Sequence, residues 1–281
     1  MKLRVLFVLV GLVAGSAPAA AQQRPLVTED PETIGPGLVL VEAGLDWSND
    51  IFFPVSGLRG DLLRLPALGL SVGVGSIVEI QVDGGLYNRL AIAERRPGPL
   101  AHMVTAQGAS TSSIEDLVVG TKIRLLAETP QRAAVGLRFA TKLPNASNES
   151  GLGLDTTDFY VSALVAKTIQ SLRLVGNLGL GILADPTRGD RQNDVLTYGI
   201  SFARAVAHGT EVVGEFNGRA SLREGDPLPG TENRALMRLG ARYTRGAARA
   251  DGALLVGMTS RDPSFGFTVG VTYVFKAFTV P

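Results

Sequence analysis

Apolar and polar residues alternate along most of this chain, so that every second side chain has the same character. The stretch 133–144 is an example, in which one parity is apolar and the other contains Arg138 and Lys142. Successive side chains of a β-strand point to opposite faces, so this pattern predicts a strand with one apolar and one cationic face. A half-exposed strand of a soluble sandwich shows the same alternation, and the rest of the chain has to show what lies on each side.

Segments with this period of two recur about twelve times, whereas helical periodicity is almost absent. We expect strands at 38–47, 63–75, 78–91, 116–126, 134–143, 159–167, 172–183, 195–205, 211–219, 235–243, 249–258 and 265–275. An even number of strands is typical of bacterial outer-membrane barrels.

The connections between these strands alternate in length. Those after odd-numbered strands are long and polar and contain Gly or Pro, as in 144–158, whereas those after even-numbered strands are short, as in 168–171. An up-and-down outer-membrane barrel has tight periplasmic turns and longer outer loops. A Greek-key sandwich has no reason to sort its connections in this way, so the alternation favours the barrel.

One face of the expected strands is rich in charge, and the opposite face is apolar. A dry core would not accommodate so many ions, but a lumen with water and counter-charges would. We therefore predict an all-β fold, an up-and-down antiparallel transmembrane β-barrel of about 12 strands. We expect Arg138 and Lys142 to pair in its lumen with Asp83, Glu79, Glu211 or Glu215. The residues predicted to line the pore are Glu42, Glu79, Asp83, Lys122, Arg124, Arg138, Lys142, Arg173, Glu215, Arg238 and Arg242.

The N-terminal residues have the three parts of a secretory signal. Lys2 and Arg4 precede an apolar run, and small residues end at Ala21, while the run is too short for a membrane anchor. We predict a cleaved signal peptide at 1–21, a periplasmic N-terminal segment at 22–37 and an outer-membrane barrel at 38–281. The expected location is the bacterial outer membrane.

The composition narrows the function. The chain has no cysteine, which excludes a disulfide framework and thiolate metal sites. Its net charge of +1 provides no general attraction to nucleic acid. Charged residues make up 19% and the chain has 34 glycines, but no apolar run after the signal is long enough for a transmembrane helix.

Several motifs resemble the outer-membrane transporter family named for the meta-pathway of phenol degradation. They are RPLVTEDPETIGPGLVLVEAGLDW at 24–47, with its inward Glu42, IEDLVVGTKIRLL at 114–126, AAVGLRFATKLPNAS at 133–147 and TVGVTYVF at 268–275. The chain differs from the family in having Glu115 where Gly is expected, and in the tail KAFTVP after Phe275. The resemblance implies a small channel or transporter barrel whose solute is hydrophobic or aromatic.

Candidate catalytic and metal-binding groups are few. Ser71 lies in a Gly-x-Ser-x-Gly match, but the nucleophile elbow needs a strand-to-helix turn and Ser71 falls inside an expected strand. The two histidines, His102 and His208, fall in a long loop and a short turn, which places them on opposite sides of the membrane. We predict that the protein is not an enzyme, has no catalytic or metal site and needs no cofactor.

The function expected from these observations is an outer-membrane channel or transporter for small solutes, which the resemblance extends to hydrophobic or aromatic ones. Ion pairs also stiffen closed barrels, so a structural or adhesion barrel is one alternative, and a lipid-modifying hydrolase is another. The expected partners are outer-membrane lipid, a small-molecule solute and the barrel-assembly machinery, with no nucleic acid.

Overall fold

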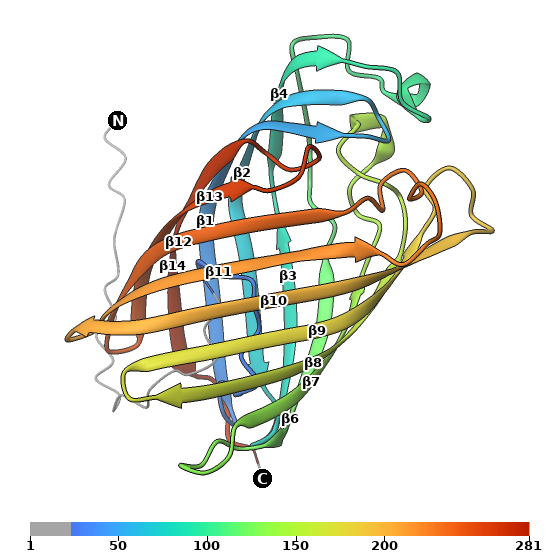
Figure 1. The fold of residues 1–281 in the computed structure, drawn as a ribbon. Helices are drawn as coiled ribbons and strands as arrows, with labels where there is room; N and C mark the ends of the chain where they lie inside the picture. Colours follow the sequence, from blue (N-terminus) through green and yellow to red (C-terminus); the bar gives the residue numbers. More distant parts are fainter. Residues whose placement is uncertain (1–23, 281) are drawn as a thin grey trace, which may run out of the picture.

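The computed structural model describes residues 24–280, and the predicted signal peptide lies outside them. These residues form one antiparallel sheet that closes on itself into a barrel (Figure 1). The first strand pairs with the last, Leu45 opposite Val269, and also with the second, Val41 opposite Leu70, so the sheet has no free edge at the point of closure. Closure lets the backbone groups of β1 bond to a neighbouring strand on both sides, and a wall in hydrocarbon requires such pairing.

The barrel contains fourteen strand segments and two short 3₁₀ turns. No helix within residues 24–280 has the length and apolarity to cross a membrane. The elements are β1 (Leu38–Phe53), β2 (Leu58–Gly73), β3 (Val78–Gly85), β4 (Asn88–Arg95), η1 (Ala101–Met103), β5 (Ser110–Ser113), β6 (Val118–Leu126), β7 (Ala134–Lys142), η2 (Asn148–Ser150), β8 (Asp158–Ile169), β9 (Leu172–Ala184), β10 (Gln192–Ala207), β11 (Thr210–Ser221), β12 (Arg234–Arg245), β13 (Ala248–Gly257) and β14 (Phe265–Lys276).

These fourteen segments make up twelve strands of the wall. β3 and β4 lie end to end along β2, and β6 and β5 lie end to end along β3 and β4. The prediction of twelve strands is thus confirmed. The strand expected at 78–91 is divided at Leu86 and Tyr87, which lie opposite Pro66 of β2. Proline has no backbone N–H to donate, so the ladder is interrupted there.

The connections differ from the predicted ones at the first hairpin. The segment 48–61 was expected to be a loop, but β1 and β2 continue through it and turn at 54–57. Leu58, Leu62 and Leu90 form a buried cluster there, against which Ile51 and Phe53 pack. This packing outweighs the loop-like composition.

The remaining connections alternate as predicted. The turns at 74–77, 127–133, 170–171, 208–209 and 246–247 lie at one end of the barrel, together with the start of β1 and the C-terminus (Figure 1). Short turns mark the periplasmic side of an outer-membrane barrel. The loops at 96–109, 143–157, 185–191, 222–233 and 258–264 lie at the extracellular end.

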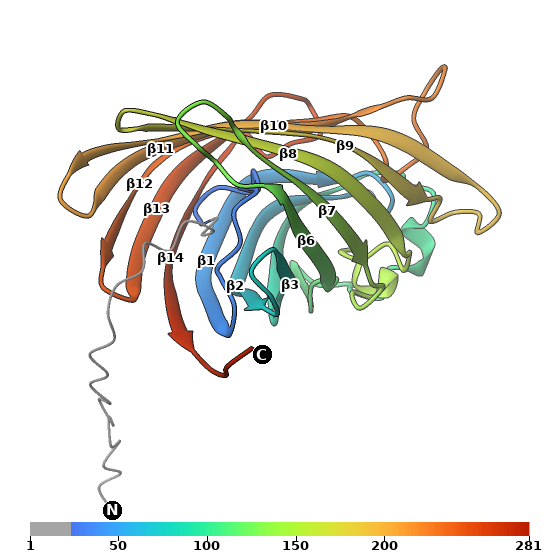
Figure 2. The same ribbon diagram turned by 90° about the horizontal axis from the view of Figure 1, so that it is seen from below.

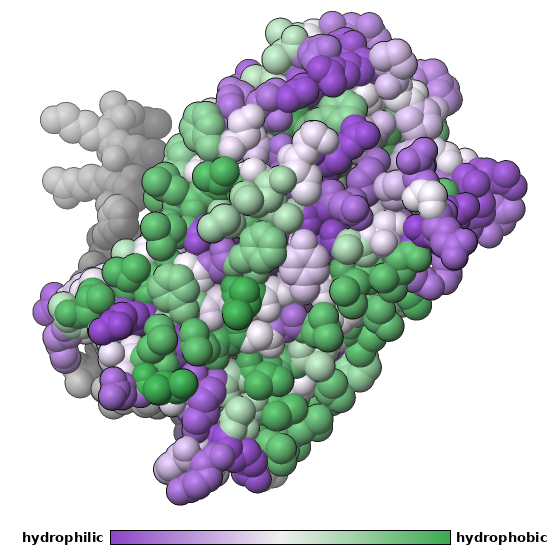
Figure 3. All heavy atoms as spheres, viewed as in Figure 1, coloured by the Kyte–Doolittle hydropathy of each residue, from purple (hydrophilic) through white to green (hydrophobic). Residues whose placement is uncertain are grey.

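The outer face of the wall is apolar, in agreement with the alternation in the sequence. Leu239 is 61% exposed and Leu254 is 69% exposed, as expected for side chains that face lipid. Hydrophobic residues cover the middle of the barrel surface in Figure 3, and hydrophilic residues gather toward its two ends. Trp47 packs against Phe265 and Phe267 of β14 on this outer face.

Candidate functional site

The candidate site is the lumen, which contains the segment that precedes β1. Residues 24–34, hereafter the plug, were predicted to belong to a periplasmic segment, whereas in the structure they lie inside the ring of strands (Figures 1 and 2). The plug contacts β14 and β13, then β11, β9, β6 and β3 in turn. It therefore crosses the lumen and touches the wall on several sides.

The plug begins with an arginine among acidic residues. Arg24 Nη2 donates to Thr268 Oγ1 at 2.7 Å and to the Val269 carbonyl oxygen at 3.0 Å. Its guanidinium also lies 3.6 Å from Asp46 and 3.5 Å from Asp251. Charge-assisted contacts of this kind are stronger than neutral ones, so Arg24 anchors the plug to the β1, β13 and β14 side of the wall.

The next anchor is the carboxylate of Glu215 on β11. It accepts hydrogen bonds from Thr28 N at 2.8 Å, Thr28 Oγ1 at 2.7 Å and Val27 N at 3.0 Å. Arg238 lies 2.5 Å from the same carboxylate and balances its charge. One buried wall residue thereby satisfies two backbone N–H groups of the plug, which has no secondary structure to satisfy them.

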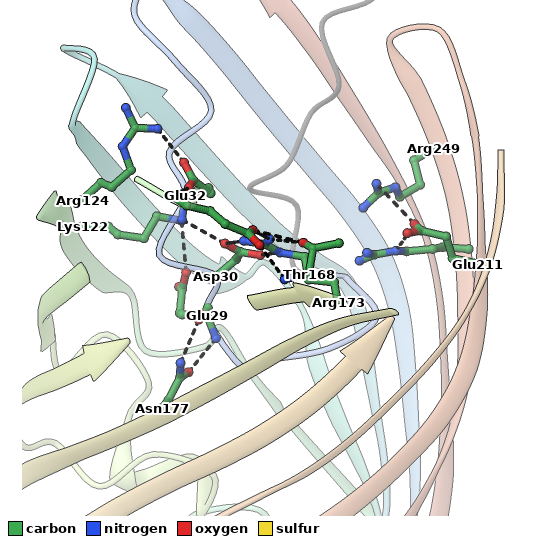
Figure 4. A network of polar contacts seen from close by, with 12 residues as sticks. Glu29, Asp30, Glu32, Lys122, Arg124, Thr168, Arg173, Asn177, Glu211 and Arg249 are labelled. Atoms are coloured by element: carbon green, nitrogen blue, oxygen red, sulfur yellow. Dashed lines mark hydrogen bonds and ion pairs between the residues drawn. The ribbon is translucent and has the colours of Figure 1, made fainter. Parts of the chain in front are cut away.

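Three acidic residues of the plug then pair with wall cations (Figure 4). Glu29 lies 3.4 Å from Lys122 and 3.0 Å from Arg138, and its backbone N donates to Asn177 at 2.6 Å. Glu32 lies 2.5 Å from Arg124. These pairs add counter-charges from the plug to the buried cations of the wall.

The third acid, Asp30, accepts two hydrogen bonds from Arg173, one of them at 2.6 Å from Nη2. Arg173 also binds Glu128 at 2.8 Å, in the periplasmic turn at 127–133. Burial would raise the pKa of Glu128, but hydrogen bonds from Thr168 and Arg173 outweigh it, and the pKa lies below the ordinary value. Asp30, Arg173 and Glu128 therefore link the plug to the periplasmic end of the barrel.

Glycines on the inner wall give the plug room. A Cβ atom at Gly44 or Gly270 would lie 2.2 Å and 2.4 Å from the guanidinium of Arg24, and these two residues face each other in the β1–β14 ladder. A Cβ at Gly199 would lie 2.9 Å from Thr28 Oγ1, and one at Gly136 would lie 3.1 Å from Pro31. Because these four glycines have no side chain, the plug can lie directly against the wall there, and we call this surface the seat of the plug. It explains part of the high glycine content.

A cavity of about 630 Å³, hereafter the upper chamber, lies between the plug and the extracellular loops. Val27, Thr28 and Glu29 of the plug form one side of it. The loops at 54–57, 143–157 and 222–233 form the opposite side with Val55, Leu152, Leu154, Gly230 and Thr231. A volume of this size is typical of small-molecule sites.

The loops above this chamber are packed together. Ser56 Oγ donates to the Gly151 carbonyl oxygen at 2.7 Å, and a Cβ at Gly230 would lie 3.2 Å from both Leu154 and Val55. Val55 is 3% exposed. These loop contacts border the chamber on its extracellular side, and the plug borders it on the other.

A second cavity, of about 540 Å³, lies beside the plug near β1, β2 and β3. It is lined by Arg24, Glu42, Asp46, Arg64 and Asp83, among others, and is more highly charged than the upper chamber. The linings of the two cavities share Val27 and Glu29 of the plug and the wall residues Ile51, Arg138, Arg234 and Leu236, so the cavities adjoin each other and the plug borders both.

The structure places the predicted pore residues on the inner face, in three groups. Glu42, Glu79, Lys122, Arg124, Arg138, Arg173 and Glu215 contact the plug. Arg238 and Arg242 pair with wall acids, Glu215 and Glu211. Asp83 lies 3.6 Å from Arg138, and Lys142 lies 3.2 Å from Asp116 and 3.0 Å from Asp158. Their part in conduction stays a prediction.

The predicted partners of Arg138 and Lys142 were partly wrong. Arg138 pairs with Asp83, as expected, and also with Glu29 of the plug. Lys142 pairs with Asp116 and Asp158 in place of Asp83, Glu79, Glu211 or Glu215. Asp158 begins β8 directly opposite Lys142 in the β7–β8 ladder, and this register brings the two side chains together on one face.

The alternation pattern missed the plug residues, because the plug is not a strand. The run of Glu29, Asp30 and Glu32 just before the first strand is a signal that could have indicated them, since the expected lumen has cations to match. The other candidate groups lie apart: Ser71 is within β2, His102 within η1 and His208 in the turn between β10 and β11.

Known proteins with a similar structure include outer-membrane channels. No family model matches the chain, and no curated protein sequence matches it. The COG4313 outer membrane channel from Pseudomonas putida F1 is similar in structure, with a TM-score of 0.60 at 13% identity over 88% of this chain and 98% of that chain. The NanC porin has a TM-score of 0.51 at 9% identity over 84% of this chain and 98% of that chain. The chain is a bacterial outer-membrane β-barrel that shares its fold with these channels.

Proposed function

We propose that this barrel is a channel for small solutes in which the plug is a gate. The observation that carries the proposal is the seat on the inner wall, where glycines and counter-charges match the plug residue by residue. A barrel with a purely structural role would need a lumen filled by side chains but no cavities for a solute. Here the lumen contains two adjoining cavities, and the plug borders both.

The proposed path has two barriers. A solute enters from outside when the apolar loop contacts above the upper chamber separate, and it leaves toward the periplasm when the plug is displaced. Selection then depends on lumen width and on the ring charges, as in channels generally. Arg138 and Lys142 are the cations of the upper chamber that we expect to act in this way.

The proposed solutes are small and hydrophobic or aromatic. Support for this class comes from the resemblance to the transporter family named for the meta-pathway of phenol degradation, and from the apolar loop residues of the upper chamber. No chemical step or cofactor belongs to the proposal. The separation of Ser71, His102 and His208 over different elements supports a role other than hydrolysis.

The test is the single-channel conductance of the refolded mature protein in a planar bilayer. Gly44→Val should displace Arg24 from its seat, because even a Cβ at this position would lie 2.2 Å from the guanidinium. We expect discrete conductance steps that are rare or absent in the wild type. Gly252→Val is the control, because Gly252 lies on the outer parity of β13 and its Cβ would meet nothing closer than 3.5 Å.

The charge of the lumen is tested in the same background. Arg138→Glu or Lys142→Glu, combined with Gly44→Val, should shift the ion selectivity of the steps toward cations. A Gly44→Val protein that inserts correctly but does not conduct would contradict the gate and would leave a closed structural barrel.

A further inference from the structure

Two arginines face each other on the inner wall beside the upper chamber. Arg219 of β11 and Arg234 of β12 are direct partners in the ladder, and both line the chamber. Like charges directly opposite each other destabilise a sheet. The other close cross-strand charge pairs of these strands, Glu215 with Arg238 and Glu211 with Arg242, are of opposite sign.

Within residues 24–280, the two arginines have a single carboxylate within ion-pair distance. Among the described residues, Asp262 is the one carboxylate within 4.0 Å of either guanidinium, at 3.7 Å from Arg234. Its Oδ2 already accepts from Ala235 N at 3.0 Å and Thr259 Oγ1 at 2.6 Å. The Glu232 carboxylate accepts a hydrogen bond from Gly230 N. In the part of the chain that the structure describes, it lies farther than 4.0 Å from both guanidinium groups.

Both arginines also donate to backbone carbonyls at the extracellular end of the barrel. Arg219 binds the Gly230 carbonyl oxygen at 2.7 Å through Nη2 and the Glu232 carbonyl oxygen at 3.0 Å through Nε. Arg234 binds the carbonyl oxygens of Arg261 and Phe52. A guanidinium has five N–H donors, so each arginine keeps donors for a further acceptor.

The other charges that line the chamber are paired with acids. Arg138 binds Glu29, and Lys142 binds both Asp116 and Asp158. Near the loops the lining has an apolar part made of Ile51, Phe53, Val55, Leu152 and Leu154. The chamber therefore has an apolar surface and, beside it, guanidinium N–H donors of Arg219 and Arg234 that can bind a further acceptor.

We propose that the upper chamber binds a small monocarboxylate with an apolar body, its carboxylate between Arg219 and Arg234 and its body against Phe53, Val55 and Leu154. This inference rests on the proposed function, since it names the class of solute that the channel takes. Planar carboxylates match the fork of a guanidinium, which favours them over neutral solutes of the same shape. A carboxylate in this place also competes with the loop carbonyls for the arginine donors, so binding loosens the loops above the chamber.

The test is isothermal titration of the refolded mature chain in detergent with benzoate and with 2-naphthoate, each compared with its neutral amide. We expect both carboxylates to bind more tightly than their amides. Arg219→Gln or Arg234→Gln should weaken carboxylate binding by about ten- to a hundredfold, the range for a lost hydrogen bond to a charged group, and should leave the amides nearly unchanged. Arg188→Gln is the control, because Arg188 is exposed in the loop at 185–191 and pairs with Asp190.

The ratio of carboxylate to amide affinity separates binding from a role in folding. If the arginines only held the loops, their replacement would weaken both kinds of ligand equally. Arg219→Lys keeps the charge and should retain part of the preference. Equal binding of acid and amide, no binding of either carboxylate, or an unchanged preference in both Gln variants would overturn the inference.

The outcome is independent of the channel test. Conductance of Gly44→Val is recorded without any carboxylate present. Conductance without a carboxylate preference would refute this inference alone, whereas a silent Gly44→Val barrel would refute the channel whatever its chamber binds.

Discussion

Replacing Lys122 with methionine should release the plug. Lys122 is 0% exposed, and its Nζ lies 3.4 Å from Glu29 Oε2 of the plug and 3.3 Å from Glu79 Oε1 of β3. Methionine keeps much of the side-chain length but removes the charge. The two carboxylates then face each other in a buried site without the cation between them, and Glu29 is the one that can move away.

The expected free-energy cost of Lys122→Met depends on the contacts that Glu29 keeps. Removing one partner of a buried ion pair costs about 3–5 kcal/mol. Arg138 and Gln81 still contact Glu29 in the variant, at 3.0 Å and 3.2 Å, so we take the lower end. A change of about 3 kcal/mol shifts the ratio of seated to displaced plug by roughly a hundredfold.

The assay is the open probability of single channels in a planar bilayer. Lys122→Met should raise it strongly over the wild type. The double variant Glu29→Gln/Lys122→Met removes one of the two opposing carboxylates and should close the channel again in part. Lys167→Met is the control, because Lys167 binds Glu128 and backbone carbonyls of the periplasmic turn and does not touch the plug.

Two results would refute this reasoning. One is a folded Lys122→Met barrel with the open probability of the wild type. The other is an open Lys122→Met channel that Glu29→Gln does not close, since the effect would then come from the wall and not from the plug. Melting of both variants in detergent shows whether the barrel itself has been weakened.

Two further predictions concern the plug and the lipid face. Glu215→Gln should release the middle of the plug, because the carboxylate accepts three hydrogen bonds from Val27 and Thr28 and is paired with Arg238. The chain has no cysteine, so Thr28→Cys introduces a single thiol into the plug. This thiol should be labelled faster when Glu215→Gln is also present than when Glu215 is unchanged. Leu239→Arg should destabilise insertion by about 2–4 kcal/mol if this position lies near the bilayer midplane, measured by urea titration in vesicles. An unchanged midpoint would contradict its lipid-facing position, where Leu239 is 61% exposed.

The barrel itself was largely predictable because its rules are local. Whether a residue such as Phe139 faces lipid or Arg138 faces the lumen depends on the parity of its position, which the alternation states directly. The number of strands and the alternation of turns and loops were predictable for the same reason. Where local pattern and packing disagree, as at 48–61, the contacts of Leu58, Leu62 and Leu90 decided the outcome.

The break of the wall at Leu86 and Tyr87 lies between these cases. Pro66 was visible in the sequence, but its effect falls on a neighbouring strand, and which residues lie opposite depends on the register. Register is set by the whole set of cross-strand pairs. Composition could therefore indicate that a proline weakens the sheet but not where the partner strand would divide.

The sequence by itself determined the barrel, its inner and outer faces and the charged character of the lumen. Only the tertiary structure decided what fills that lumen. Thr28 meets Glu215 and Arg24 meets Thr268 across separations of 187 and 244 residues. Contacts between a segment without regular structure and distant strands leave no period in the sequence, because they arise when the closed wall brings those strands around it. The sequence shows which residues are charged, but the closure of the barrel decides which of them form ion pairs.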